Sequence, residues 1–252
     1  MAKYDQEILN AVALRGKLTV TELSEMLGVS DQTIRRIVKP LVEAGQVEKV
    51  HGAIVSVSNP MTAPFQIRMQ HNREAKAEIA SKILDLVPDG ASVAIDAGSS
   101  AGFAAQALQM RQKLTVVTNS AFVASTLCMT GSNKVYFAGT QLRDYDGASY
   151  DRTAFDVVER MSVDFSILTV AQVCKRRGFL VAEQCEADMA QAMAAIAEQP
   201  IFAIDQSKLD GSTDQGLLAM GRFAKLPWVV TDAPLPDGVR DMEDLARFIS
   251  AR

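Results

Sequence analysis

Residues 18–57 read LTVTELSEMLGVSDQTIRRIVKPLVEAGQVEKVHGAIVSV, and this stretch decides how the first part of the chain folds. Thr19 and Glu22 have the T-x-x-E spacing of a capping box, which predicts that a helix starts directly after the threonine. Gly28 suits the left-handed conformation that ends a helix, and Ser30 stands where a second N-cap belongs. The stretch therefore predicts two helices joined by a tight glycine turn.

The apolar spacing of both helices supports this prediction. The first helix places Leu23, Met26 and Leu27 on one face. The second, over 31–44, has apolar residues at the i, i+3, i+4, i+7 and i+8 positions of one stripe, namely Ile34, Ile37, Val38, Leu41 and Val42. Its other face carries polar residues, namely Gln32, Arg35, Arg36, Lys39 and Glu43, and Gly45 is expected to close it. Pro40 removes one backbone hydrogen bond and is expected to kink the helix.

Two helices with so short a turn form a helix-turn-helix, whose second helix enters the DNA major groove. Residues Val47 to Val50 and Ile54 to Val57 are predicted to form the two strands of a wing. In the second helix Gln32 can bond adenine, Arg36 can bond guanine, and the methyl group of Thr33 can touch thymine. The predicted DNA-binding residues are Ser30, Gln32, Thr33, Arg35, Arg36, Lys39, Lys49, His51 and Gly52. The alternative is an ordinary helical hairpin with a solvated charged face; agreement among caps, turn, apolar register and wing favours DNA binding.

Composition sets limits on the class of protein. The chain has 252 residues and a net charge of −4, and residues 1–58 hold as many Lys and Arg as Asp and Glu. Such a neutral DNA-binding domain predicts few phosphate contacts per subunit and a need for a homo-oligomer, either a dimer or a tetramer. Three cysteines without C-x-x-C spacing, and the lack of a membrane span or signal peptide, predict a reduced cytoplasmic protein without disulfides or a zinc site.

The chain divides by pattern into three parts. Residues 1–57, with a first helix over Tyr4 to Leu14, form the predicted winged helix-turn-helix domain. The run from Ser58 to Pro64 has the composition of a linker, and 58–74 is assigned to it. Residues 75–252 alternate helices with short buried strands, which predicts an α/β domain with a mostly parallel sheet. This alternation is expected to end in a closing helix over Met242 to Ile249.

Ligands of open α/β sheets bind at the carboxyl ends of the strands, and here those ends are polar and rich in small residues. Backbone N–H groups in such loops, next to a helix N-terminus, favour an anion. A phosphorylated sugar or a similar metabolite is predicted, with Ser99 and Ser100 taking the phosphate, Asp96 the sugar hydroxyls and Lys208 supplying a countercharge. The predicted effector-binding residues are Asp96, Gly98, Ser99, Ser100, Thr118, Asn119, Ser120, Gly139 and Lys208. The alternative is that these glycine-rich loops are structural turns.

The sequence resembles the DeoR family of bacterial transcription regulators over essentially its whole length. Residues 29–36 match the family pattern V-S-x-x-T-I-R-R, and His51-Gly52-Ala53 stands where the family has H-G-G. Marks of the sensor domain follow in order: Arg68, Asn72, Lys76, Asp96-x-Gly98-Ser99-Ser100, Thr118-Asn119-Ser120, Gly139, Arg143, Gly147, Asp164, Gly178, Glu186-Ala187, Met193, Asp205-x-Ser207-Lys208 and Thr231-Asp232. Departures occur at Ile37-Val38, Ala53, Ala138, Ala190-Gln191 and 171–177.

The resemblance implies a fold like that of ribose-phosphate isomerase and glucosamine-phosphate deaminase for the second domain. It also implies a repressor of a carbohydrate catabolic operon that a phosphorylated sugar releases from its DNA operator; activation by the ligand is an open alternative. The competing class is a sugar-phosphate isomerase with an appended DNA-binding domain, in which Asp96 or Glu183 would act as the base. An architectural DNA protein fits poorly with the neutral charge and the long α/β domain. We expect no catalytic residues, no cofactor, no metal and no membrane partner.

Overall fold

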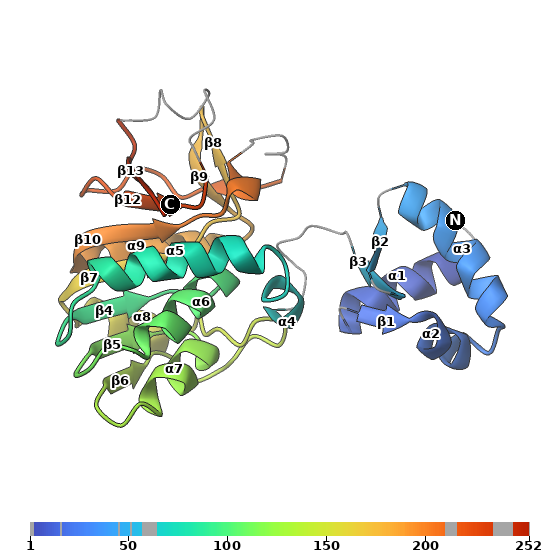
Figure 1. Ribbon diagram of the computed structural model, residues 1–252, viewed down its shortest axis with the longest axis horizontal. Helices are drawn as coiled ribbons and strands as arrows, with labels where there is room; N and C mark the ends of the chain where they lie inside the picture. The colour runs from blue at the N-terminus through green and yellow to red at the C-terminus, as the bar shows by residue number, and fades with distance from the viewer. Residues whose placement is uncertain are drawn as a thin grey trace. The chain divides into compact units, whose positions relative to one another are not determined.

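The computed structural model describes residues 3–15, 17–44, 46–50, 52–56, 65–209, 216–233 and 244–251. The chain forms two compact units, Met1–His71 and Asn72–Arg252, which are described separately below (Figure 1). No helix within the described residues is long and apolar enough to span a bilayer. The short helix α4 (Phe65–Arg68) falls inside the predicted linker segment 58–74.

The first unit is a winged helix-turn-helix, as the sequence predicts. Its elements are α1 (Lys3–Arg15), β1 (Lys17–Thr19), α2 (Val20–Leu27), α3 (Asp31–Glu43), β2 (Val47–Val50) and β3 (Ala53–Ser56). The strands form an antiparallel sheet in the order β1-β3-β2, so the wing hairpin gains a third strand that the pattern did not predict. The buried side chains of Ile8, Val12, Leu23, Ile34 and Val38 join the three helices in one core.

The predicted helix caps are confirmed. The Glu22 backbone N–H donates to Thr19 Oγ1 at 3.1 Å, and the Thr19 N–H donates to a Glu22 carboxylate oxygen at 2.7 Å, which completes the capping box. Gly28 ends α2 with a φ of +65°. The hydroxyl of Ser30 accepts the N–H of Thr33 at 3.3 Å and so starts α3. Local hydrogen bonding therefore fixes the turn between the two helices.

Parts of the predicted apolar faces are wrong. Met26 and Val42 are 43% and 37% exposed, because they lie at the margins of their helical stripes rather than at the centres. The helix α3 runs through Pro40 to Glu43, where Ala44 ends it. Pro40 is exposed, so its missing hydrogen bond falls on the solvent side of the helix. Gly45, His51 and Val57 lie outside the described residues.

The second unit is built on a parallel sheet with the strand order β13-β12-β10-β7-β4-β5-β6 (Figure 1). These strands are β4 (Ser92–Ile95), β5 (Thr115–Thr118), β6 (Lys134–Phe137), β7 (Val163–Leu168), β10 (Ala197–Ala203), β12 (Trp228–Thr231) and β13 (Arg247–Ser250). Every pairing among them is parallel, which confirms the predicted α/β class. The chain adds β5 and β6 on one side of β4 and then returns to place β7 on the other side. The boundary between β4 and β7 is therefore the topological switch point of the sheet.

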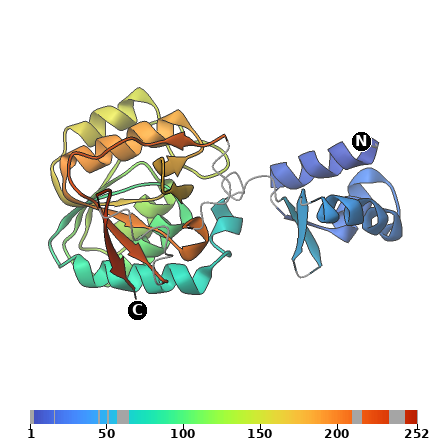
Figure 2. The same ribbon diagram turned by 90° about the horizontal axis from the view of Figure 1, so that it is seen from above.

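Helices cover both faces of this sheet, as the two views show (Figures 1 and 2). One face carries α5 (Arg73–Leu86), α6 (Ser99–Leu108) and α7 (Ala121–Cys128), whose apolar sides are buried against the strands. The other face carries α8 (Arg152–Glu159) and α9 (Gln184–Ile196). A stacked pair of rings, Phe179 and Phe202 with centroids 4.2 Å apart, lies in the core of this second face.

Two features of the second unit differ from the predicted pattern. A small antiparallel sheet of β8 (Gln172–Cys174), β9 (Gly178–Val181) and β11 (Leu218–Ala219) was not predicted, because its strands are too short for a periodic signal. The predicted closing helix over Met242 to Ile249 is wrong. Residues Arg247 to Ser250 form the edge strand β13, which pairs with β12 in parallel, while 241–243 lie outside the described residues. Here sheet pairing overrides a weak helical spacing.

Candidate functional site

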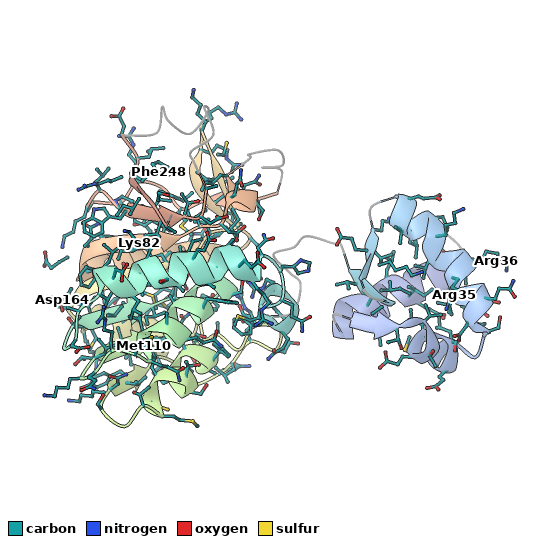
Figure 3. All side chains as sticks on the ribbon, viewed as in Figure 1. Arg35, Arg36, Lys82, Met110, Asp164 and Phe248 are labelled. Carbon is teal, nitrogen blue, oxygen red and sulfur yellow. The ribbon has the colours of Figure 1, made fainter. Side chains whose placement is uncertain are left out.

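The polar face of α3 is the best candidate for a nucleic-acid interface. Gln32, Arg35, Arg36 and Lys39 are all exposed, while Ile34 and Val38 on the opposite face are buried. Figure 3 shows Arg35 and Arg36 on α3, with Arg36 reaching outward into solvent. Lys39 has an ion pair with Glu43 at 3.9 Å, one turn later on the same helix. The hydrophobic stripe therefore fixes which side of α3 is presented, and that side carries the donors that base edges require.

The wing adds two further predicted positions. Lys49 is exposed on β2 opposite Ile54 of β3. Gly52 has a φ of +81° in the turn between these strands, with nothing within 4 Å of the place where a Cβ would stand. Ser30 and Thr33 act locally, since their hydroxyl oxygens lie 3.0 Å apart at the N-terminus of α3. His51 lies outside the described residues.

In the second unit, Asp96 lies at the switch point of the sheet, directly after β4. Its side chain is 6% exposed, and Oδ1 accepts the backbone N–H of Ala97 at 2.7 Å. Oδ2 faces Thr169 at the end of β7, with the Thr169 hydroxyl oxygen 3.2 Å away and its N–H at 3.4 Å. Burial, with a smaller contribution from Glu186, raises the pKa of Asp96 to about 7, although these hydrogen bonds oppose the shift. Asp96 therefore holds two neighbouring strand ends together.

The loop after Asp96 leads into α6 with little room to spare. Gly98 has a φ of +139°, and a Cβ there would stand 2.7 Å from the Thr169 hydroxyl, so the position requires glycine. Ser99 and Ser100 occupy the first turn of α6 and are 5% and 2% exposed. The hydroxyl of Ser100 is buried without a hydrogen-bond partner. The helix N-terminus and these hydroxyls form a compact group of uncharged donors.

The predicted residues after β5 and β6 lie at the same carboxyl edge of the sheet and are held there by hydrogen bonds. Asn119 donates from Nδ2 to the Ser149 carbonyl at 3.1 Å, while its Oδ1 is buried without a partner. The hydroxyl of Ser120 caps α7, and that of Thr118 accepts the Ser120 N–H at 3.1 Å. Gly139 has a φ of +123°, and a Cβ there would stand 1.9 Å from Ser149 Oγ. These side chains build the loops around Asp96, and their own surfaces are largely covered.

Lys208 lies on a different part of the edge, at the end of the short helix η1 (Gln206–Lys208) after β10. In the sheet β7 separates β10 from β4, so Lys208 and Ser99 follow strands that are not neighbours. The Asp205 carboxylate is 2% exposed and accepts Nδ2 of Asn72 at 3.1 Å. Burial would raise the pKa of Asp205, but Lys208, Ser207, Lys76 and Asn72 together lower it. A cleft of about 710 Å³ lies here, lined by Asn72, Arg73, Glu74, Ala75, Glu78, Asp205, Gln206, Ser207 and Asp232.

A charged cluster around Arg143 is the main feature of this edge that was not predicted as a site. The guanidinium contacts Glu183 at 3.1 Å and Glu186 at 2.9 Å, and it bonds Asp146 through two of its nitrogens. The rings of Tyr145 and Tyr150 lie on it, with centroids 4.3 and 4.4 Å from the guanidinium carbon. Burial would lower the pKa of Arg143, yet the hydrogen bond to Asp146 and the acidic neighbours raise it.

The cluster ties the segment after β6 to the N-terminus of α9. Arg143 and Glu186 both match the family's sequence pattern. That match is the signal from which they could have been included in the predicted site. Burial and a hydrogen bond to Glu183 raise the pKa of Tyr145. Burial likewise raises the pKa of the Cys185 thiol to about 11, which makes it a poor nucleophile. Within the described residues, no group of three His, Cys, Asp or Glu side chains is arranged to hold a metal ion.

Comparison with known proteins covers both units. The sequence profile of the DeoR-like helix-turn-helix domain matches residues 5–59, and that of the DeoR C terminal sensor domain matches residues 71–233. The glycerol-3-phosphate regulon repressor of Escherichia coli is 29% identical over 92% of this chain and 91% of its own length. The L-fucose operon activator of Haemophilus influenzae is 28% identical over 94% of both chains. Among solved structures, ribose 5-phosphate isomerase A of Methanocaldococcus jannaschii has a TM-score of 0.40, with 14% identity over 56% of each chain.

Proposed function

Because this chain belongs to the DeoR family of transcription regulators, we propose that it represses a carbohydrate catabolic operon and is released from the operator by a phosphorylated sugar. The observation that supports operator binding is the exposed polar face of α3, which faces outward because Ile34 and Val38 on the opposite face are buried. Helix caps on both sides of the turn fix where α2 ends and where α3 begins. Its Gln and Arg side chains are the ones that read bases in a major groove.

We infer that the effector binds at the carboxyl edge of the parallel sheet. Ser99, Ser100 and the backbone N–H groups at the start of α6 are suited to a phosphate, because they are donors at the positive end of a helix. The carboxylates of this edge repel an anion and suit sugar hydroxyls instead. Lys208, on the loop after β10, is a source of positive charge for the same ligand. The burial of Ser99 and Ser100 implies that the loops open when a ligand enters.

The isomerase alternative has one observation in its favour, the pKa of about 7 at Asp96, which suits a general base. Both oxygens of this carboxylate are nevertheless occupied by N–H or O–H groups of Ala97 and Thr169. A base engaged in holding two strands is poorly placed to accept a substrate proton. An assay of ribose 5-phosphate isomerisation separates the two functions: steady turnover that Asp96→Asn abolishes would establish the enzyme.

A homo-oligomer is part of the proposal. One winged helix with a neutral charge balance buries too little DNA for tight specific binding, so two copies reading repeated half-sites are required. We place the working protein in the cytoplasm, where a bacterial operator is accessible. Sedimentation of the full chain with and without operator DNA tests this assembly, and a monomer in both states would contradict it.

The release experiment uses the full chain and DNA selected from a random-sequence library. Operator affinity is measured with glycerol 3-phosphate, ribose 5-phosphate and glucosamine 6-phosphate, each at rising concentration. One of these or a related phosphate should weaken operator binding by about 5- to 150-fold. The Ser99→Ala/Ser100→Ala variant should keep its operator affinity and lose most of this response. Ser125→Ala on α7 is the matched control, because its exposed hydroxyl bonds only the Phe122 carbonyl of its own helix. Failure of a broad phosphate panel to change operator binding would refute the effector proposal.

A further inference from the structure

Asn72 has an unusual backbone conformation at the point where the second unit begins. Its φ and ψ are 48° and 41°, in the left-handed region, and among the described non-glycine residues only Lys113 shares a positive φ. It stands at the N-cap of α5, yet its side chain makes no capping hydrogen bond. An asparagine at this position ordinarily uses its side-chain oxygen to cap the helix. The Asn72 side chain therefore does not cap α5.

The amide of Asn72 bonds instead to the loop after β10. Nδ2 donates to Asp205 Oδ1 and to Ser207 Oγ, both at 3.1 Å. Asp205 is buried, its pKa is lowered below the ordinary value, and it also accepts the Ser207 hydroxyl and N–H. The bond from Asn72 to this carboxylate is therefore charge-assisted, which makes it stronger than one between neutral groups.

The same loop carries the predicted effector residue Lys208. Its backbone is held by several bonds: the Gln206 N–H donates to Asp232 at 2.9 Å, and the Lys208 N–H donates to the Asp205 carbonyl at 3.0 Å. Asn72, Asp205 and Ser207 line one cleft of about 710 Å³. A ligand that moves this loop, or that donates a hydrogen bond to Asp205 in place of Asn72, thus acts directly on the Asn72 amide.

Asn72 is also the residue that follows His71, the last residue of the first unit. A left-handed conformation is strained for a non-glycine residue, though less so for asparagine, so outside support decides whether it persists. When the two amide bonds are lost, the residue is free to return to the right-handed or extended region. That change of φ and ψ redirects the chain immediately before α5. The backbone conformation of Asn72 thus depends on bonds to the loop after β10, which is the arrangement that a hinge requires.

We propose that Asn72 is a positioning residue that couples effector binding to operator binding: its amide holds the left-handed hinge while Asp205 and Ser207 are free to accept it, and an effector at the Lys208 loop releases it. This inference rests on the proposed function. It assigns to Asn72 the transmission of the signal and no direct part in binding either the DNA or the phosphate.

The test compares Asn72→Gly with wild type in the full chain. Glycine adopts positive φ without strain and removes the whole side chain, including the amide that bonds Asp205 and Ser207. The phosphate that releases wild type in the panel above is the probe. Because the amide holds the hinge that the effector releases, Asn72→Gly without ligand should bind the operator about as weakly as phosphate-saturated wild type does, and the coupling between phosphate and operator should fall from the wild-type factor of about 5–150 toward 1. A merely structural role would lower stability and leave the coupling in place.

Two further variants complete the design. Lys113→Gly is the matched control, because it relieves the other positive φ among the described non-glycine residues at the amino end of β5, the end of the sheet opposite the loop after β10, and its coupling should equal that of wild type. Ser207→Ala removes one acceptor of the Asn72 amide and leaves the backbone at 72 unaltered, so a partial loss of coupling is expected. Wild-type coupling in both Asn72→Gly and Ser207→Ala would overturn the inference.

A readout without ligand keeps this test separate from the effector proposal. Coupling is reciprocal, so operator DNA should change hydrogen exchange at the amides of Gln206, Ser207 and Lys208 in wild type. The same addition should leave those amides unchanged in Asn72→Gly. If no phosphate releases wild type but the exchange difference is present, the proposed effector is wrong and the hinge stands. If a phosphate releases wild type and Asn72→Gly equally, the hinge is wrong and the effector stands.

Discussion

Thr169 Oγ1 lies 3.2 Å from Asp96 Oδ2 and 2.9 Å from the carbonyl oxygen of Ala97, so one hydroxyl bridges the carboxyl ends of β4 and β7. A hydroxyl has a single proton, and both neighbours are acceptors when Asp96 is ionised. Protonation of Asp96 resolves this conflict, because the carboxyl group then donates to Thr169 while Thr169 donates to Ala97. The geometry agrees with the raised pKa of Asp96, and it makes the switch point of the sheet sensitive to pH.

The stability of the second unit should fall as the pH rises from 5 to 7 because of Asp96. Its folded pKa of about 7 lies above the ordinary value of 3.8, so the group stabilises the fold at low pH, and that contribution is lost as the pH rises through the folded value. The expected loss is roughly 2 kcal/mol between these pH values. Urea unfolding of wild type and Asp96→Asn at both pH values measures it as a difference. Equal pH slopes in the two proteins would show that Asp96 is ionised throughout.

Replacing Gly139 should destabilise the second unit far more than replacing another positive-φ glycine. A Cβ at 139 would stand 1.9 Å from Ser149 Oγ and 2.3 Å from Ser149 Cβ, whereas Gly131 has nothing within 4 Å. Gly139→Ala is expected to cost more than about 3 kcal/mol, and Gly131→Ala about 1–2 kcal/mol from backbone strain alone. Thermal unfolding compares the two. Adding Ser149→Gly should restore much of the loss at 139, and similar costs for the two alanine variants would contradict the packing.

Replacing Arg36 and replacing Lys39 should weaken operator binding in different ways. Arg36→Ala is expected to cost about 1–3 kcal/mol and to relax preference at one base pair, as the loss of a base-reading arginine does. Lys39→Ala should weaken all sequences alike and reduce the salt slope by about 1, as a phosphate contact does. Fluorescence anisotropy on single-base operator variants at several salt concentrations separates these effects. Lys82→Ala on α5 is the control, and a folded Arg35→Ala/Arg36→Ala variant with normal specificity would displace the interface from α3.

The capping box of α2 should contribute measurably to the stability of the first unit. Thr19→Ala removes the acceptor of the Glu22 N–H and should lower the free energy of unfolding by about 1 kcal/mol. Thr21→Ala, at an exposed position within the same helix, should change it by less than about 0.5 kcal/mol. Urea unfolding of the full chain, monitored by circular dichroism, measures the effect of each substitution on the transition of residues 1–71. An equal effect of the two changes would mean that the cap contributes nothing beyond helix propensity.

The sequence predicted the features that depend on hydrogen bonds between residues close together in the chain. The caps at Thr19 and Ser30 and the turn at Gly28 depend on neighbours within three or four residues, so a pattern reveals them. The parallel sheet was predicted for a similar reason, because buried strands and amphipathic helices alternate. The edge strand β13 was missed because its conformation depends on pairing with β12, and the spacing of Met242, Leu245 and Ile249 imitates a helix.

The candidate effector site shows the same limit. Sequence placed Asp96 and Asn119 correctly after the strands β4 and β5, but it could not show that they bond Thr169 and Ser149. Arg143 escaped prediction because its partners include Glu183 and Glu186, which are about forty residues away along the chain. Long-range ion pairs leave no periodic signal.

The order of strands in the large sheet has a consequence for the newly made protein. Strand β4 is synthesised early, but its inner neighbour is β7, and Val93 pairs with Phe165. The small sheet of the first unit closes much sooner, since Lys17 pairs with Val55. On a ribosome the DNA-reading unit can therefore form while half of the sensor is still untranslated. A message cut short before Phe165 would encode the reading helix and strands β4, β5 and β6, but not β7, the strand whose end meets Asp96 at the switch point.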